Sequence, residues 1–224
     1  MICYHKLVDY VLQTLWIQKK QFLSFLIVIP AVMALQLVAV FNASDDWYSL
    51  IYSLNYEFFY VPFFLIMFIA HLLFNHCWLV LRMVQKRSHL VLYLCIYCFV
   101  LALIFTVVIF LSAFLLSWEH MGYIPLNGHS HFGEFFESMI IFLLVMMIEG
   151  LLSLLINEWL RHYVLSIGIV IALTILDRYT IHLIGFCFVI GYKLTFFYTL
   201  AVLLSTVIVL GILMQFFLVR KDFL

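Results

Sequence analysis

The sequence predicts an all-α membrane protein with several transmembrane helices. Of its 224 residues, 68% are hydrophobic and 10% are charged, a balance typical of polytopic membrane proteins rather than of soluble domains. The apolar residues form long continuous runs, such as residues 91–116. A run of roughly 20 helical residues crosses a bilayer core of about 30 Å. A transmembrane β-barrel needs alternating polar and apolar positions instead, and these runs do not alternate.

The N-terminal segment, residues 1–22, is too polar to span a membrane. Its apolar positions recur at helical spacing, which predicts an amphipathic helix lying in the membrane interface. Trp16 is the expected aromatic anchor of this interfacial helix, with Lys19 and Lys20 at its polar end.

Six spans are predicted to follow the interfacial helix within a single transmembrane domain. The first contains Pro30, which is tolerated where neighbouring helices satisfy the freed carbonyl. The fifth is short, and we expect the stretch after it, up to residue 197, to be broken or re-entrant. The predicted spans are residues 23–41, 58–80, 91–117, 139–159, 163–176 and 198–218.

The basic residues set the expected topology, because short loops rich in Lys and Arg face the cytoplasm. With six spans, nine of the eleven Lys and Arg residues lie on one side, and only Arg178 and Lys193 lie on the other. The longest polar loop, residues 118–138, contains no Lys or Arg and fits the outer side. We therefore expect both termini to be cytoplasmic. Two full spans within residues 163–197 are the alternative, which would place the basic C-terminal tail outside.

A basic hinge, residues 81–90 with the sequence LRMVQKRSHL, joins the second and third predicted spans. Helical spacing would put Arg82, Lys86 and Arg87 on a shared arc. Val84 and Ser88 lie in the same hinge, beside these basic residues. The hinge is either a topology signal, which needs only its charges, or a docking element for a soluble partner, which also needs shape.

Glu149 lies near the middle of the fourth predicted span. A charge at that depth costs at least about 2.5 kcal/mol. Its side chain should therefore face protein or a water-filled cavity, or carry a proton. Two interpretations follow: Glu149 lines a transport route, or it is a neutral, hydrogen-bonded acid at a helix contact.

The outer loop holds several histidines and carboxylates, among them His129 and His131. A His-x-His pair could ligate Zn or Cu together with a nearby carboxylate. The simpler interpretation is an ordinary polar loop, and we expect no required metal site. Cys95 and Cys98 are expected to be core cysteines rather than a redox or metal pair.

The sequence contains no motif typical of an enzyme that works in or on the membrane. It has no Walker A motif for ATP hydrolysis, no Gly-x-Ser nucleophile site and no paired-glutamate motif within the spans. The formal net charge is zero, so nucleic acid is not an expected partner. We expect a chain without catalytic residues and without a cofactor of its own.

Two stretches resemble a known family. WLVLRMVQKRSHLVLYLCIY (78–97) resembles the hinge of the ABC-2 type permeases, the small six-span membrane subunits of bacterial ABC exporters. IEGLLSLLINEWLRHYVLSIGIVIALTIL (148–176) resembles their passage from span four into span five. The layout of interfacial helix, six spans and broken segment is similar as well. The chain differs in having Asn75 and His76, where the family often has an acidic residue, and Leu94 and Cys95, where it often has a lysine.

The resemblance implies a transport subunit in a bacterial plasma membrane. The hinge would be a coupling helix that docks on a cytosolic ABC ATPase, which binds ATP and Mg, and a second permease copy would complete the assembly. The substrate would be a hydrophobic or amphipathic peptide, lipid or drug, or the system would give immunity to antimicrobial peptides. Substrate, direction of transport and identity of the second copy stay open. The alternative is a metal- or ion-handling membrane protein that uses the His-rich outer loop.

Overall fold

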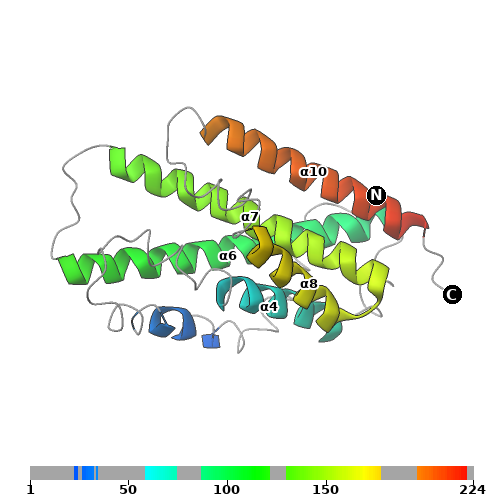
Figure 1. The fold of residues 1–224 in the computed structure, drawn as a ribbon, viewed down its shortest axis with the longest axis horizontal. Helices are drawn as coiled ribbons and strands as arrows, with labels where there is room; N and C mark the ends of the chain where they lie inside the picture. Colours follow the sequence, from blue (N-terminus) through cyan, green and yellow to red (C-terminus); the bar gives the residue numbers. More distant parts are fainter. Residues whose placement is uncertain are drawn as a thin grey trace.

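The computed structural model describes residues 23–24, 27–32, 34, 59–74, 87–121, 130–177 and 196–220. This part of the chain is all helical, as predicted. Five labelled helices make up most of it (Figure 1). They are α4 (Val61–Phe74), α6 (Arg87–Met121), α7 (Ser130–Leu160), α8 (Tyr163–Leu176) and α10 (Phe196–Arg220).

Three of these helices are long and apolar enough to cross a membrane. The membrane class is therefore supported, while the predicted count of six spans is not confirmed. Helices α4 and α8 have 14 residues each, so each is about 21 Å long, short of the roughly 30 Å hydrocarbon core. Helix α8 has the bounds predicted for the fifth span. The membrane-length segments are Val91–Leu116, Phe135–Leu160 and Phe196–Phe217.

The predicted outer loop, residues 118–138, is wrong at both ends. Helix α6 continues to Met121 and α7 already begins at Ser130. The prediction used polarity to end the helices, but a helix satisfies its own backbone hydrogen bonds and can continue beyond the hydrocarbon. His131 therefore lies in the first turn of α7, not in a loop.

Several predicted features lie outside the described residues. They are the interfacial helix of residues 1–22, most of the hinge and the segment 178–195. Within the first predicted span, residues 27–32 are helical and include Pro30. The described part of the hinge, residues 87–90, forms the N-terminal turn of α6.

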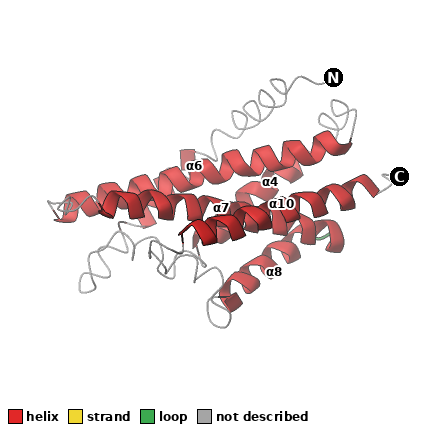
Figure 2. Cartoon of the chain, turned by 90° about the horizontal axis from the view of Figure 1, so that it is seen from above, coloured by secondary structure: helices red, strands yellow, loops and turns green. Residues whose placement is uncertain are grey.

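Helix α7 is the centre of the bundle. It contacts each of α4, α6, α8 and α10. Figure 1 shows it between α6 and α10, and Figure 2 shows the same bundle turned by 90°. Of the membrane-length windows, 61% of the α7 window is buried, against 50% for α6 and 17% for α10. Helix α10 thus lies at the edge of the bundle, and α7 carries most of the packing.

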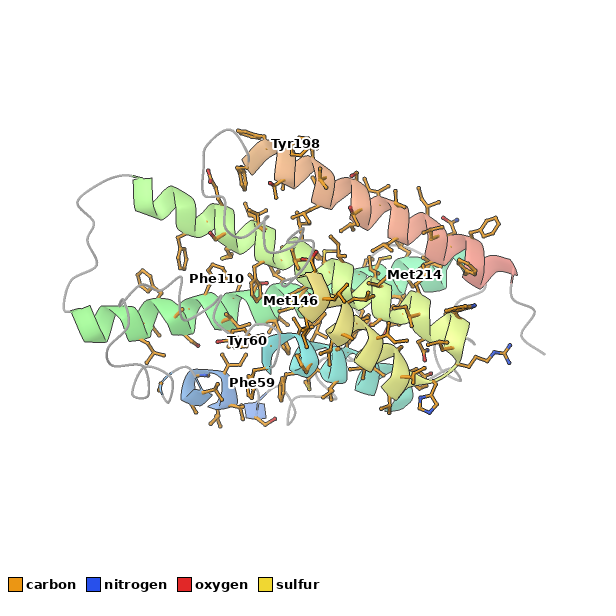
Figure 3. All side chains as sticks on the ribbon, viewed as in Figure 1. Phe59, Tyr60, Phe110, Met146, Tyr198 and Met214 are labelled. Atoms are coloured by element: carbon orange, nitrogen blue, oxygen red, sulfur yellow. The ribbon has the colours of Figure 1, made fainter. Side chains whose placement is uncertain are left out.

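Aromatic side chains fill the contacts of α6 with α4 and α7. Phe64 meets Phe105 edge to face at 5.3 Å between ring centroids, and Phe68 stacks on Tyr97 at 5.7 Å. Farther along α6, Phe110 meets Phe142 edge to face at 5.6 Å, and Figure 3 shows Phe110 between α6 and α7. Such pairs contribute about 0.5–1.5 kcal/mol each beyond the area they bury.

Gly150 marks a close approach between α7 and its neighbours α4 and α6. A Cβ atom at this position would lie 2.6 Å from Cys98 Sγ and 3.2 Å from Phe64 Cε1. The Cys98 thiol also reaches the backbone oxygen of Met147 at 3.8 Å. Glycine at residue 150 therefore lets α4 and α6 pack against α7 at the same level.

The basic residues at the helix termini share one end of the bundle. The N-terminus of α6 and the C-termini of α7 and α10 lie together at the right of Figure 1. Arg87 begins α6, Arg161 follows α7, and Arg220 ends α10. This arrangement fits the expectation that these residues face the same side of the membrane.

We expect Gly150→Ala to lower the stability of the bundle by a net amount of about 1 kcal/mol. Alanine gains about 1 kcal/mol of helix propensity, but overpacking against Cys98 Sγ and the Phe64 ring costs about 1–3 kcal/mol. Thermal unfolding in detergent measures the effect. The cost should shrink in a Cys98→Ala background, because the sulfur is the closest atom.

Gly168→Ala is the matched control. It also lies within a helix, but no described atom lies within 4 Å of a Cβ built there. This variant should be at least as stable as the parent protein. Equal effects at the two glycines would contradict the close approach at Gly150.

Candidate functional site

The candidate site lies where α7 meets α8, around Glu149. This carboxyl is 2% exposed in α7, so the predicted intramembrane glutamate faces protein rather than lipid. Of the predicted coupling residues, Arg87 and Ser88 are the first two residues of α6, and their side chains are not described. The predicted residues outside the described part are Trp16, Lys19, Lys20, Arg82, Val84, Lys86 and His129.

A two-residue turn joins α7 to α8. Arg161 has a φ of 54°, a left-handed conformation that costs a non-glycine residue about 1–2 kcal/mol. Its N–H donates to the backbone oxygen of Asn157 at 2.7 Å, which closes α7. His162 caps α8, since its Nδ1 accepts a hydrogen bond from the Leu165 N–H at 3.3 Å. The two helices are therefore antiparallel neighbours.

The tight turn fixes which residues of α7 and α8 share a level. Thr174 Oγ1 lies 3.4 Å from Glu149 Oε1, and these two residues are equally far from the turn at Arg161 and His162. The same symmetry places Asn157 level with Ser166.

Buried polar residues lie on both helices, and we call this set the polar seam. On α7 the polar positions recur every four residues, and on α8 they lie two turns apart, so each set follows one helical face. All five side chains are at least 93% buried. The members of the seam are Glu149 (2% exposed), Ser153 (0%), Asn157 (7%), Ser166 (0%) and Thr174 (5%).

The hydroxyl groups of the seam donate to the backbone of their own helices. Ser153 Oγ donates to the Gly150 oxygen at 2.7 Å, Ser166 Oγ to the Tyr163 oxygen at 2.8 Å and Thr174 Oγ1 to the Val170 oxygen at 2.9 Å. These bonds leave the hydroxyl lone pairs as acceptors. The seam is thus rich in acceptors and suited to a group that brings a proton or a positive charge.

Asn157 adds a further acceptor to the seam. Its Oδ1 is buried and has no hydrogen-bond partner within the part of the chain that the structure describes. Leaving a buried polar group unsatisfied costs about 1–3 kcal/mol. Such a group is a candidate contact for a substrate, a water molecule or an ion.

Sequence reasoning found Glu149 but missed the four other members of the seam. A few serine, threonine or asparagine residues change the composition of an apolar run very little, so they do not stand out in the sequence. The usable signal was the spacing of Glu149, Ser153 and Asn157, which puts three polar residues on one face of a predicted span.

The described residues contain no group of three His, Cys, Asp or Glu side chains that could hold a metal ion. His131 belongs to α7, but its side chain is not described, and the same holds for Glu134. Cys98 is buried and Cys95 half-buried, both without a disulfide, in line with their expected place in the core.

We expect Asn157→Leu to stabilise the protein by about 1 kcal/mol if the residue has only a structural role, because the change removes a buried acceptor without a described partner. Thermal unfolding in detergent measures this. A binding role predicts that the same variant is stable but impaired in transport, since function often retains costly polar groups. A clear loss of stability would mean that Asn157 Oδ1 has a structural partner.

His129 and His131, which the sequence predicts to lie in an outer loop, give a second prediction. His129→Ala combined with His131→Ala should leave insertion, assembly and transport intact, since we expect no required metal there. Zinc binding by the purified protein and transport with and without a chelator are the measurements. Transport that zinc restores in the chelated parent, but not in the double variant, would establish a metal site.

Comparisons of the chain with protein-family models, with curated proteins and with solved structures find no match. The resemblance of the hinge and of the α7–α8 passage to the ABC-2 type permeases therefore rests on the sequence alone. Any function drawn from it is a proposal.

Proposed function

We propose that the chain is the membrane permease subunit of an ATP-driven ABC exporter for a hydrophobic or amphipathic substrate. ATP hydrolysis belongs to a cytosolic partner, which docks on the hinge of residues 81–90, and a second permease copy completes the assembly. The observation that carries the proposal is the position of the hinge relative to α6. Helix α6 begins at Arg87, inside the hinge, and continues without interruption to Met121.

A continuous helix is a suitable element for transmitting a push from the cytoplasmic side. Helix α6 has 35 residues and is about 52 Å long, more than the thickness of the hydrocarbon core. A partner that displaced its first turn would therefore displace the membrane-spanning part as well. A topology signal needs no such continuity, because it acts through charge alone.

The contacts of α6 would carry the displacement into the bundle. Cys98 of α6 lies against Gly150 of α7, and Phe110 packs against Phe142. Close-packed side chains transmit displacement because they leave little free volume. Movement of the hinge would reach α7, and through it the polar seam, where an amphipathic substrate could find its polar contacts.

We expect a shuffle of residues 81–90 with unchanged composition to preserve membrane insertion and to abolish docking. Docking energy concentrates in a few buried anchors, and loss of 2 kcal/mol weakens binding roughly thirtyfold. The measurement is co-purification with a co-expressed candidate cytosolic ABC ATPase, together with ATP-dependent transport of an amphipathic peptide into inverted membrane vesicles.

A shuffle of residues 122–129 is the control, because it changes a connection between helices without touching the hinge. This control should bind the ATPase like the parent. If the hinge shuffle also binds and transports normally, the hinge is only a topology signal. If the parent itself binds no ATPase, the exporter function is wrong.

A further inference from the structure

The turn between α7 and α8 carries a surface that is both apolar and basic. Trp159, in the last turn of α7, is 80% exposed, and Val164 and Leu165, in the first turn of α8, are 74% and 50% exposed. Arg161 and His162 lie between them in the sequence and are exposed as well. We call these five residues the turn patch. Exposed apolar side chains beside hydrogen-bond donors match a partner that has both characters.

The turn patch lies at the edge of the membrane. The membrane-length segment of α7 ends at Leu160, so the two residues that follow fall at the level of the lipid headgroups. Tryptophan is enriched at this level, because its ring has an apolar body and a polar N–H. The ring of Trp159 can therefore meet the first carbons of the acyl chains while Arg161 reaches the phosphate groups.

The donors of the turn patch fit a phosphate group. Within the described part of the chain, the Arg161 side chain makes no ion pair or hydrogen bond, and a guanidinium binds phosphate through paired N–H donors. His162 Nδ1 accepts the Leu165 N–H, so the neutral ring carries its proton on Nε2 and can donate it. Glu158, the nearby acidic residue of α7, is half-buried and has an interaction of its own.

The charges at this end of the bundle favour an anionic lipid. Arg87 begins α6 and Arg220 ends α10 at the same end as the turn patch (Figure 1), and we expect this end to face the cytoplasm. The cytoplasmic leaflet contains anionic lipids, which attract basic residues close to the membrane surface. A zwitterionic lipid would instead bring a cationic group close to Arg161 together with its phosphate.

We propose that the turn patch binds the headgroup of an anionic phospholipid, with Arg161 and His162 donating to its phosphate and the three apolar side chains contacting its glycerol and first acyl carbons. The bound lipid holds the turn at the level of the headgroups. Helix α8 returns into the bilayer for only about 21 Å, so its far end then stays within the hydrocarbon. The lipid site does not depend on the proposed exporter function.

Quenching of tryptophan fluorescence by brominated phospholipids tests the proposal on the full chain. The chain has five tryptophans, so the Trp159 signal is the difference between the parent and Trp159→Phe. The bilayers mix phosphatidylglycerol with phosphatidylcholine, and one of the two lipids carries the bromine. We expect about a fivefold preference for phosphatidylglycerol at Trp159, because one basic residue near an anionic surface contributes about that factor. Bromine near the glycerol should quench more than bromine farther along the chain.

Arg161→Gly removes the guanidinium without straining the turn, because glycine readily adopts the φ of 54° found here. This variant should unfold in detergent at a temperature no lower than the parent, and its preference for phosphatidylglycerol should disappear. Arg161→Asn should lose the preference too, since asparagine also tolerates a left-handed backbone. Arg161→Lys keeps the charge and should keep the preference.

Phe197→Ala is the matched control, because it removes an exposed aromatic side chain from the other end of α10. It should leave the lipid preference unchanged. A Trp159 signal that neither lipid quenches would overturn the proposal, because protein would then cover the patch. Equal quenching by the two lipids, or a preference that survives in both neutral variants, would do so as well. If millimolar inorganic phosphate abolishes the preference, the site takes free phosphate and not a lipid.

Discussion

The bundle depends on the close approach of α4 and α6 to α7 at Gly150. In a membrane, lipid tails are as apolar as the side chains, so helices associate through tight packing rather than through escape from water. A residue without a Cβ lets the Cys98 thiol and the Phe64 ring come within contact of the α7 backbone. The aromatic pairs of Phe105 and Phe110 then extend this contact toward the C-terminal end of α6.

The remaining helices follow from the central position of α7. Helix α8 is too short to cross a bilayer alone, but its turn at Arg161 and His162 returns it directly onto α7, where its polar face is buried. Helix α10 packs on α7 as well, yet many of its large apolar side chains, such as Ile208 and Ile212, remain exposed. Lipid can cover such a face at little cost, so α10 is held mainly by its inner residues, among them Met214 (Figure 3).

The sequence was sufficient for the features that depend on composition. Long apolar runs identified the three membrane-length helices, and the high cost of a charge in hydrocarbon singled out Glu149. Helix ends at Met121 and Ser130 were missed because polarity marks the edge of the membrane and not the end of a helix. The contact of Glu149 with Thr174 was missed for another reason. The level of Thr174 depends on the length of the α7–α8 turn, and the left-handed conformation at Arg161 has no signal in the side chain of that residue.

Glu149 and Gly150 are neighbours in sequence, and this places two different contacts in one turn of α7. Successive residues of a helix point about 100° apart, so Gly150 faces α4 and α6 while Glu149 faces α8. A shift of α6 against Gly150 would therefore act on the turn of α7 that contacts Thr174 of α8. Coupling between distant sites requires an element with two arrangements that both sites bias. If the hinge moves α6, this single turn is the place where that movement would reach the contact between Glu149 and Thr174.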